Sequence, residues 1–297
     1  MRKKNKNLSE ITFRDVKAYF QNQRYKIKKN VSDFSSLPEK IFQEMEPVFV
    51  VSTGRAGSEL LVRLMKKANM GSIFHEPHPR MFLGSKLAYK LGPGQIDAKK
   101  MAFLNARYFL LKNAYLQEQR FIETNNRITF FMDAIAEVFP KAKFIHMIRH
   151  PGAFVRSGLR RNYYTGNEND DGRLTPNEQN PVSTEWEDLT QMEKIAWLWN
   201  ETNTFIEEKK VSLDLDKVLT VHANDLFTNP EKFQAICNFL NHPELDRDQI
   251  ESMIAKPVNK QKQGQVSKWD TWPADEIALL KKWTPIGKRY GFWSDSE

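Results

Sequence analysis

The sequence predicts an α/β protein with three layers: a central parallel sheet flanked by helices on both faces. Short runs of β-branched or aromatic residues alternate along the chain with helical patterns, and each run is bounded by turn residues or charges. Such alternation is typical of parallel sheets covered by helices. The predicted strands lie in VFVVS (48–52), SIFHE (72–76), KFIHMI (143–148) and VLTVHA (218–223), and the clearest helices in LLVRLMKKA (60–68) and EKIAWLWNETNTFIEEKK (193–210).

The beginning of the chain differs from the rest in charge. Residues 1–30 carry ten Lys and Arg against two acidic residues, whereas the remaining 267 residues carry 35 of each. We interpret residues 1–40 as a solvated basic N-terminal arm, with a helix whose capping box starts near Thr12 to Asp15. A weak contact with an anionic partner is open to such an arm. We expect no nucleic acid partner for the protein.

Residues 41–297 are long enough for one catalytic domain with a large core. The single cysteine, Cys237, lies in the helical pattern FQAICNFL and offers neither a disulfide partner nor a metal-ligand spacing, which fits a reducing compartment. No run approaches the roughly 18 apolar residues of a membrane span, and MRKKNKNLSE lacks the apolar core of a secretory signal. We therefore expect a cytoplasmic protein.

The turn after the first predicted strand has the composition of a phosphate site. A buried strand runs into Ser52–Ser58 (STGRAGS) and then into a helix from Glu59, which places backbone N–H groups, a helix N-terminus and the Arg55 guanidinium around one point. The turn lacks the lysine and hydroxyl of an ATP-binding G-x-x-x-x-G-K-[ST] loop, and it is not a dinucleotide G-x-G-x-x-G. An ordinary glycine-containing turn is the alternative.

A second anion site is predicted after the third predicted strand. In KFIHMIRHPGAFVRSGLRR (143–161), Arg149 ends the strand and Ser157 follows eight residues later in a helix. That spacing can bring a guanidinium and a hydroxyl to one point, and the pair suits a phosphate monoester. Because both sites follow strands of one sheet, a nucleotide lying across the strand ends could place a phosphate at each.

A long polar segment follows this helix. Residues 163–186, YYTGNENDDGRLTPNEQNPVSTEW, are rich in Asn, Asp, Gly and Pro and have almost no aliphatic residues. A structureless insertion of this length in a compact domain is more often a lid or binding loop than a spacer. Plain disorder is the alternative.

Over roughly residues 45–292 the chain resembles the sulfotransferases that use 3′-phosphoadenosine-5′-phosphosulfate (PAPS). STGRAGSELL (52–61) resembles their loop for the 5′-phosphosulfate, and AEVFPKAKFIHMIRHPGAFVRS (136–157) resembles their 3′-phosphate site. Two later segments are also similar: VLTVHANDLFTNPEKFQAICNFLN (218–241), with Asn224 where an acid is usual, and residues 258–292, the family's closing segment. The resemblance implies a P-loop NTPase-like fold, transfer of a sulfuryl group with 3′-phosphoadenosine-5′-phosphate (PAP) as product, and no metal.

The resemblance also assigns cofactor-binding residues. The 5′ site is implied to contain Arg55, Ala56, Gly57, Ser58, Glu59 and Leu60, and the 3′ site Arg149 and Ser157, closed by Lys260, Lys262 and Gly264. Two departures stand out. Glu59 replaces a usual Ser or Thr, and its carboxylate would repel the 5′-phosphate unless it turns outward or contacts the acceptor. The closing segment has no Arg-Lys-Gly triplet. A further difference is His150, which stands where an Asp is frequent, and we expect His150 to have a structural role.

Sulfuryl transfer needs a group that takes the proton of the acceptor hydroxyl or amine. SIFHEPHPRMF (72–82) ends beside the phosphate loop and offers three candidates, in the order Glu76, His78, His75. HEPH resembles the KEPH-type stretch of sulfotransferases that act on sugars, in which the Glu is the base, so a carbohydrate or a small metabolite is the candidate acceptor. The alternative is that Glu76 pairs with a basic neighbour and the histidines cap the strand. Arg55 and the loop N–H groups would stabilise the leaving phosphate.

Two other functions remain open. A kinase of the same architecture would need the lysine and magnesium-binding hydroxyl that the loop lacks. A non-catalytic nucleotide-binding protein would keep the fold without acceptor chemistry, and Glu59 in the loop leaves that open.

Overall fold

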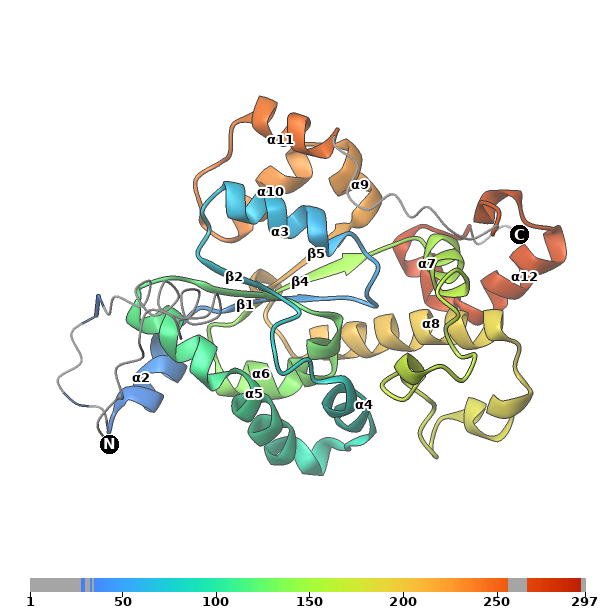
Figure 1. Cartoon of the computed structure of the whole chain (residues 1–297), viewed down its shortest axis with the longest axis horizontal. Coiled ribbons are helices and arrows are strands. Elements are labelled where there is room, and N and C mark those ends of the chain that lie inside the picture. Colours follow the sequence, from blue (N-terminus) through green and yellow to red (C-terminus); the bar gives the residue numbers. More distant parts are fainter. Residues whose placement is uncertain (1–27, 30–32, 34, 256–265, 295–297) are drawn as a thin grey trace, which may run out of the picture.

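The computed structural model describes residues 28, 29, 33, 35–255 and 266–294. At its centre is a five-stranded parallel sheet with the order β2-β3-β1-β4-β5, so that β1 lies in the middle (Figure 1). Val48 of β1 is opposite Ile122 of β3 on one side and Lys143 of β4 on the other. The strands are β1 (Val48–Val51), β2 (Ser72–His75), β3 (Phe121–Thr124), β4 (Lys143–Ile148) and β5 (Val218–His222).

Helices cover both faces of the sheet, which confirms the predicted three-layer fold. Val48 and Val50 pack into one apolar cluster, and Phe49 and Val51, which alternate with them, pack into the other. Figure 1 shows α3, α9, α10 and α11 on one side of the sheet and α4, α5, α6 and α8 on the other. Their bounds are α3 (Ser58–Lys67), α4 (Phe82–Lys90), α5 (Ile96–Leu116), α6 (Met132–Val138), α8 (Gln191–Lys210), α9 (Ala223–Thr228), α10 (Glu231–Phe239) and α11 (Arg247–Ile254).

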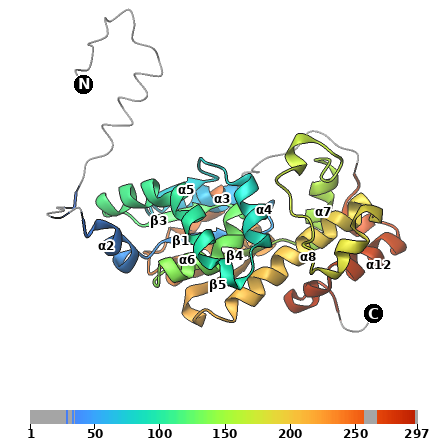
Figure 2. The same ribbon diagram turned by 90° about the horizontal axis from the view of Figure 1, so that it is seen from below.

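Three further α-helices and several short 3₁₀ helices complete the described part of the chain. Figure 2 shows α7, α8 and α12 together at one end of the molecule. They are α2 (Leu37–Glu44), α7 (Pro151–Leu159) and α12 (Ala274–Trp283), with 3₁₀ helices η2 (Pro93–Gln95), η3 (Asn126–Phe131), η4 (Glu168–Asp170), η5 (Pro181–Thr184), η6 (Trp186–Asp188), η7 (Leu215–Lys217), η8 (Trp269–Thr271) and η9 (Pro285–Tyr290).

The four strands predicted from sequence are all present, but β3 was missed. Its sequence, FIET, is short and contains Glu123, a residue that strands disfavour and cores exclude unless it is paired. The structure supplies that pair: Nε of Arg107 in α5 lies 2.7 Å from Oε2 of Glu123, and both side chains are fully buried. The missed strand carries part of the functional site described below.

Helix α8 fixes the end of β4. It begins with a capping box in which Thr190 Oγ1 accepts from Glu193 N–H and the Glu193 carboxylate accepts from Thr190 N–H. In the middle of α8, the indole Nε1 of buried Trp199 donates to the backbone carbonyl of Arg149 at 2.9 Å. The residue predicted to bind a phosphate therefore has its backbone anchored by a long helix.

Helix α2 is part of the core. Leu37 and Ile41 are 4% and 0% exposed and belong to the main apolar cluster, so the boundary expected at residue 40 falls inside a core helix. Lys29 pairs with Glu44 at 2.8 Å and lies over the ring of Tyr115. The helix expected near residues 12–15 lies outside the described residues. In the described part of the chain, no helix is long and apolar enough to cross a membrane.

Residues 163–186 form a compact loop, called the polar loop below. Asp170 organises its beginning: its carboxylate accepts from the backbone N–H groups of residues 164, 165, 166 and 167 at 2.9 to 3.2 Å and from Arg173 Nε at 2.6 Å. Tyr164 donates its hydroxyl to the carbonyl of buried Leu174. Local polar bonds hold the beginning of this segment, and Leu174 and Trp186 anchor it to the main apolar cluster.

Candidate active site

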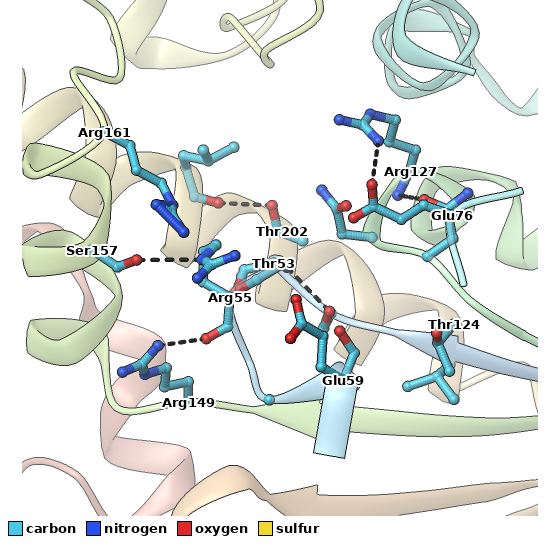
Figure 3. A pocket seen from close by; sticks show the side chains of 18 of the residues that line it. Thr53, Arg55, Glu59, Glu76, Thr124, Arg127, Arg149, Ser157, Arg161 and Thr202 are labelled. Carbon is cyan, nitrogen blue, oxygen red and sulfur yellow. Dashed lines mark hydrogen bonds and ion pairs between the residues drawn. The ribbon is translucent and has the colours of Figure 1, made fainter. Parts of the chain in front are cut away.

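A large cavity of about 1050 Å³ opens at the carboxyl ends of the strands. Its walls come from the loop after β1, the ends of β2 and β3, the start and inner face of α7, and the polar loop (Figure 3). In open α/β sheets this edge is where ligands bind, because loops from neighbouring strands converge there.

The loop after β1 forms part of the wall of this cavity. Gly54, Arg55 and Gly57 have positive φ angles of 79°, 55° and 86°, and a Cβ at Gly57 would collide with the ring of Phe227. These turns bring the N-terminus of α3 to the cavity, where its first N–H groups have no partner within the helix. Arg55, Gly57, Ser58, Glu59 and Leu60 line the cavity, whereas Ala56 is buried and offers only its backbone.

Arg149 and Ser157 both contact Arg55 of this loop. Arg149 donates from Nη1 to the carbonyl of Arg55 at 2.7 Å, and Arg55 donates from Nε to Ser157 Oγ at 3.4 Å. Figure 3 shows Arg55 between the side chains of Arg149 and Ser157. The two anion sites predicted from separate motifs are therefore adjacent and directly bonded to each other.

Positive charge is concentrated on this side of the cavity. Burial lowers the pKa of Arg149, and repulsion from three neighbouring guanidiniums lowers it further; these belong to Arg55, Arg156 and Arg161. Burial and repulsion from Arg55 likewise lower the pKa of Arg161, against the attraction of Tyr163 and Glu59. A cluster of cations that are partly desolvated and repel one another is stabilised by a bound anion.

Glu59, the unusual residue of the loop, faces this cluster. It lines the cavity, and its attraction acts on Arg161. Arg161, in the turn after α7, thus offsets part of the negative charge that Glu59 brings to the predicted 5′ site.

The ends of β2 and β3 form the other side of the cavity. Glu76 has a positive φ of 44°, and its Oε2 lies 3.4 Å from Nη1 of Arg127, in the segment after β3. His75 lines the cavity too, with Nδ1 2.7 Å from Thr124 Oγ1. Glu76 therefore has the basic neighbour that the sequence left as an alternative, and its side chain remains 38% exposed.

The remaining predicted site residues are not among the described residues that line the cavity. His78 is exposed and is absent from the described residues that line the cavity, so the structure does not bring it to the other candidates. Lys260, Lys262 and Gly264 lie outside the described residues. From residue 266 the chain is described again. The carbonyls of Val266 and Ser267 accept from Arg156 Nε at 3.0 and 2.8 Å, which attaches this part of the closing segment to α7.

His150 has the structural position expected of it. Its Nδ1 accepts from the N–H of Gly152 at 3.1 Å and so caps α7. Its ring stacks on the indole of Trp269 in the closing segment, with the ring centroids 3.8 Å apart. Burial lowers the pKa of His150 to about 4, so the ring is neutral near pH 7 and free to accept this bond.

Sequence reasoning missed Arg127. Its backbone N–H donates to Asn125 Oδ1, and Arg127 lines the cavity together with Asn125 and Asn126. The available signal was the polar run Asn-Asn-Arg directly after FIET, which becomes informative once FIET is known to be a strand.

The polar loop covers one side of the cavity through Tyr163, Asn169, Gly172, Arg173 and Leu174.

We predict that Asp170→Asn will speed amide hydrogen exchange at residues 164–167 by roughly 10- to 100-fold, because a charged acceptor of four N–H groups is lost. Asp171→Asn, an exposed neighbour, is the matched control. Equal exchange in both variants would show that Asp170 does not hold the loop.

A model of the sulfotransferase family matches residues 47–247. No curated protein matches the chain. Similar solved structures include sulfotransferase STF9 from Mycobacterium avium (12% identity, 95% of this chain and 82% of that chain, TM-score 0.49) and mouse sulfotransferase SULT7A1 complexed with PAP (14%, 88% and 93%, 0.48). Another is the sulfotransferase domain from the Synechococcus PCC 7002 olefin synthase (18%, 81% and 88%, 0.45). The family match covers more than half of the sequence, and the chain therefore belongs to the sulfotransferase family.

Proposed function

We propose that this protein transfers a sulfuryl group from PAPS to a hydroxyl or amine of an acceptor, with carbohydrates and small metabolites as the first classes to test. The observation that carries the proposal is the joined anion site of Arg55, Arg149 and Ser157 at the N-terminus of α3. Two adjacent sites of positive charge suit a nucleotide that bears a phosphate at each of two positions.

On the donor side, the residues of the chain bind the two phosphates of PAPS and neutralise their charge. Arg149 and Ser157 hold the 3′-phosphate, and Lys260, Lys262 and Gly264 of the closing segment complete this contact. Arg55 and the N–H groups of Ala56, Gly57 and Ser58 stabilise the negative charge that develops on the 5′-phosphate as it leaves. The donor supplies the sulfuryl group, and no metal is needed.

On the acceptor side, Glu76 is the proposed base, with His75 next. The acceptor oxygen or nitrogen forms the new bond to sulfur while its proton passes to the Glu76 carboxylate. The bond from sulfur to the 5′-phosphate oxygen breaks, and its electron pair remains on that oxygen. Arg127, paired with Glu76 at 3.4 Å, holds the carboxylate at the cavity wall.

Binding of PAP, measured by calorimetry, tests the donor assignment. We expect PAP to bind without added magnesium and adenosine 5′-monophosphate to bind about 10- to 100-fold more weakly, because it lacks the 3′-phosphate and its charge-assisted bonds. Equal affinity for both nucleotides would contradict the 3′ site.

Transfer from ³⁵S-labelled PAPS to a panel of hydroxyl and amine compounds tests catalysis. Labelled product would establish the enzyme. Tight PAP binding with no transfer to any compound would favour a non-catalytic nucleotide-binding protein, and magnesium-dependent ATP hydrolysis would favour a kinase-like activity.

A further inference from the structure

The cavity holds more positive charge than the two donor sites use. Among the described residues that line it are eight arginines but only two acidic residues, Glu59 and Glu76. Figure 3 shows them on two sides: Arg55, Arg149 and Arg161 lie together, and Arg127 lies apart with Glu76. The eight arginines are Arg55, Arg80, Arg127, Arg149, Arg156, Arg160, Arg161 and Arg173.

Several of these arginines are engaged in holding the protein itself. Arg156 donates to the carbonyls of the closing segment, and Arg173 pairs with Asp170 and lies over the ring of Tyr163. Arg55 and Arg149 form the donor site. What remains on the other side of the cavity is Arg127 with Arg80, in the segment after β2.

Arg127 is held in place before any ligand binds. Its guanidinium lies 3.5 Å over the ring of Phe82, its Nη1 contacts Glu76, and its side chain is 18% exposed. Gly172 of the polar loop lies next to the same ring, because a Cβ at this position would lie 3.1 Å from Cδ1 of Phe82. An arginine fixed by stacking loses little conformational freedom when it binds a planar or tetrahedral anion.

Arg80 adds a second positive charge near Arg127. Burial is the main cause that lowers the pKa of Arg127, and repulsion from Arg80 lowers it as well, while Glu76 opposes both. At this wall Glu76 pairs with Arg127, and Arg80 adds a second guanidinium to the lining of the cavity. A further anion would relieve the repulsion, and the acceptor is the reactant that enters beside Glu76.

We propose that the acceptor carries an anionic group, a carboxylate, sulfate or phosphate, which binds Arg127 and Arg80 while its hydroxyl or amine faces Glu76. This inference rests on the proposed function, since it names the class of acceptor for that site. It makes Arg127 and Arg80 specificity-determining residues: they would select acidic sugars or acidic metabolites over neutral ones.

Selenate, a tetrahedral dianion located by its anomalous scattering, tests the site without an acceptor. In crystals of the PAP complex soaked in selenate, we expect selenium beside Arg127 and Arg80. In solution with PAP saturating, Arg127→Gln and Arg80→Gln should each weaken selenate binding about 10- to 100-fold. Arg63→Gln, which removes an exposed arginine of α3 away from the cavity, should leave the binding unchanged.

Two selenate results would overturn the proposal. One is no selenate at this wall in the wild-type protein. The other is binding that both variants retain, which would mean an adventitious ion only. A failure of PAP to bind would instead count against the proposed function. In that case the selenium positions in crystals without PAP still report directly on Arg127 and Arg80.

Matched acceptors separate anion recognition from positioning of the base. We expect glucuronate to be preferred over glucuronamide, and 4-hydroxyphenylacetate over its amide, with glucose 6-phosphate distinguishing a phosphate from a carboxylate requirement. Arg80→Gln leaves the pair of Glu76 with Arg127 intact, so it should raise KM for the acids about 10- to 100-fold and leave KM for the amides unchanged. An equal fall of kcat for acids and amides in Arg127→Gln, with Arg80→Gln unaffected, would mean that Arg127 only positions Glu76.

Discussion

Replacing Glu76 by Gln is expected to lower kcat by roughly 10²- to 10⁴-fold while the affinity for PAP is preserved. The amide keeps the size of the side chain and can still accept a hydrogen bond from Arg127, but it cannot take a proton. Because Glu76 is on the side of the cavity opposite Arg149 and Ser157, the donor site should be undisturbed (Figure 3). Steady-state turnover with labelled PAPS and calorimetry with PAP measure the two effects separately.

The histidines provide the controls for this experiment. His78→Asn should turn over normally, since His78 is exposed and outside the described lining of the cavity. His75→Asn should have a smaller effect than Glu76→Gln, because its Nδ1 is engaged with Thr124 Oγ1. Loss of turnover in His75→Asn alone, with Glu76→Gln nearly normal, would transfer the role of base to His75.

Arg149→Ala should weaken PAP binding by about 2–3 kcal/mol, or roughly 30- to 150-fold, because a buried charge-assisted contact with a phosphate is lost. Calorimetry measures this change. The backbone of residue 149 should stay in place, since Trp199 Nε1 is bonded to its carbonyl.

The same substitution also removes a bond inside the protein. Arg149 Nη1 donates to the carbonyl of Arg55, so part of the loss comes from a looser phosphate loop. Ser157→Ala removes one hydroxyl at the same site and should have a smaller effect in the same direction. Arg63→Ala is the control for removing a surface arginine. Unchanged PAP affinity in Arg149→Ala would overturn the assignment of the 3′ site.

The amino-acid sequence alone was sufficient for the fold class and for the loop, the arginine and the serine that the structure brings together on one side of the cavity. Apolar runs bounded by turns predicted four of the five strands, and Ser52–Ser58 and Arg149 with Ser157 were found from local spacing. Such features are legible because each depends on residues a few positions apart: a strand end, a turn that needs glycine at positive φ, and a helix that begins directly after it.

The tertiary structure decided the acceptor side, because its contacts join residues that are far apart in the chain. Glu123 is buried in β3 opposite Arg107 of α5, a partner 16 positions away that the local sequence does not reveal, and β3 in turn places Arg127. The order β2-β3-β1 then sets Arg127 against Glu76, 51 positions earlier, and leaves His78 outside. The polar loop has few aliphatic residues to give a periodic pattern, and the shape of its beginning depends on where one carboxylate, Asp170, meets its backbone donors. A buried charged side chain is stable only when a partner of opposite charge lies beside it. That partner is far away in the chain, so the local sequence does not predict which residue it is.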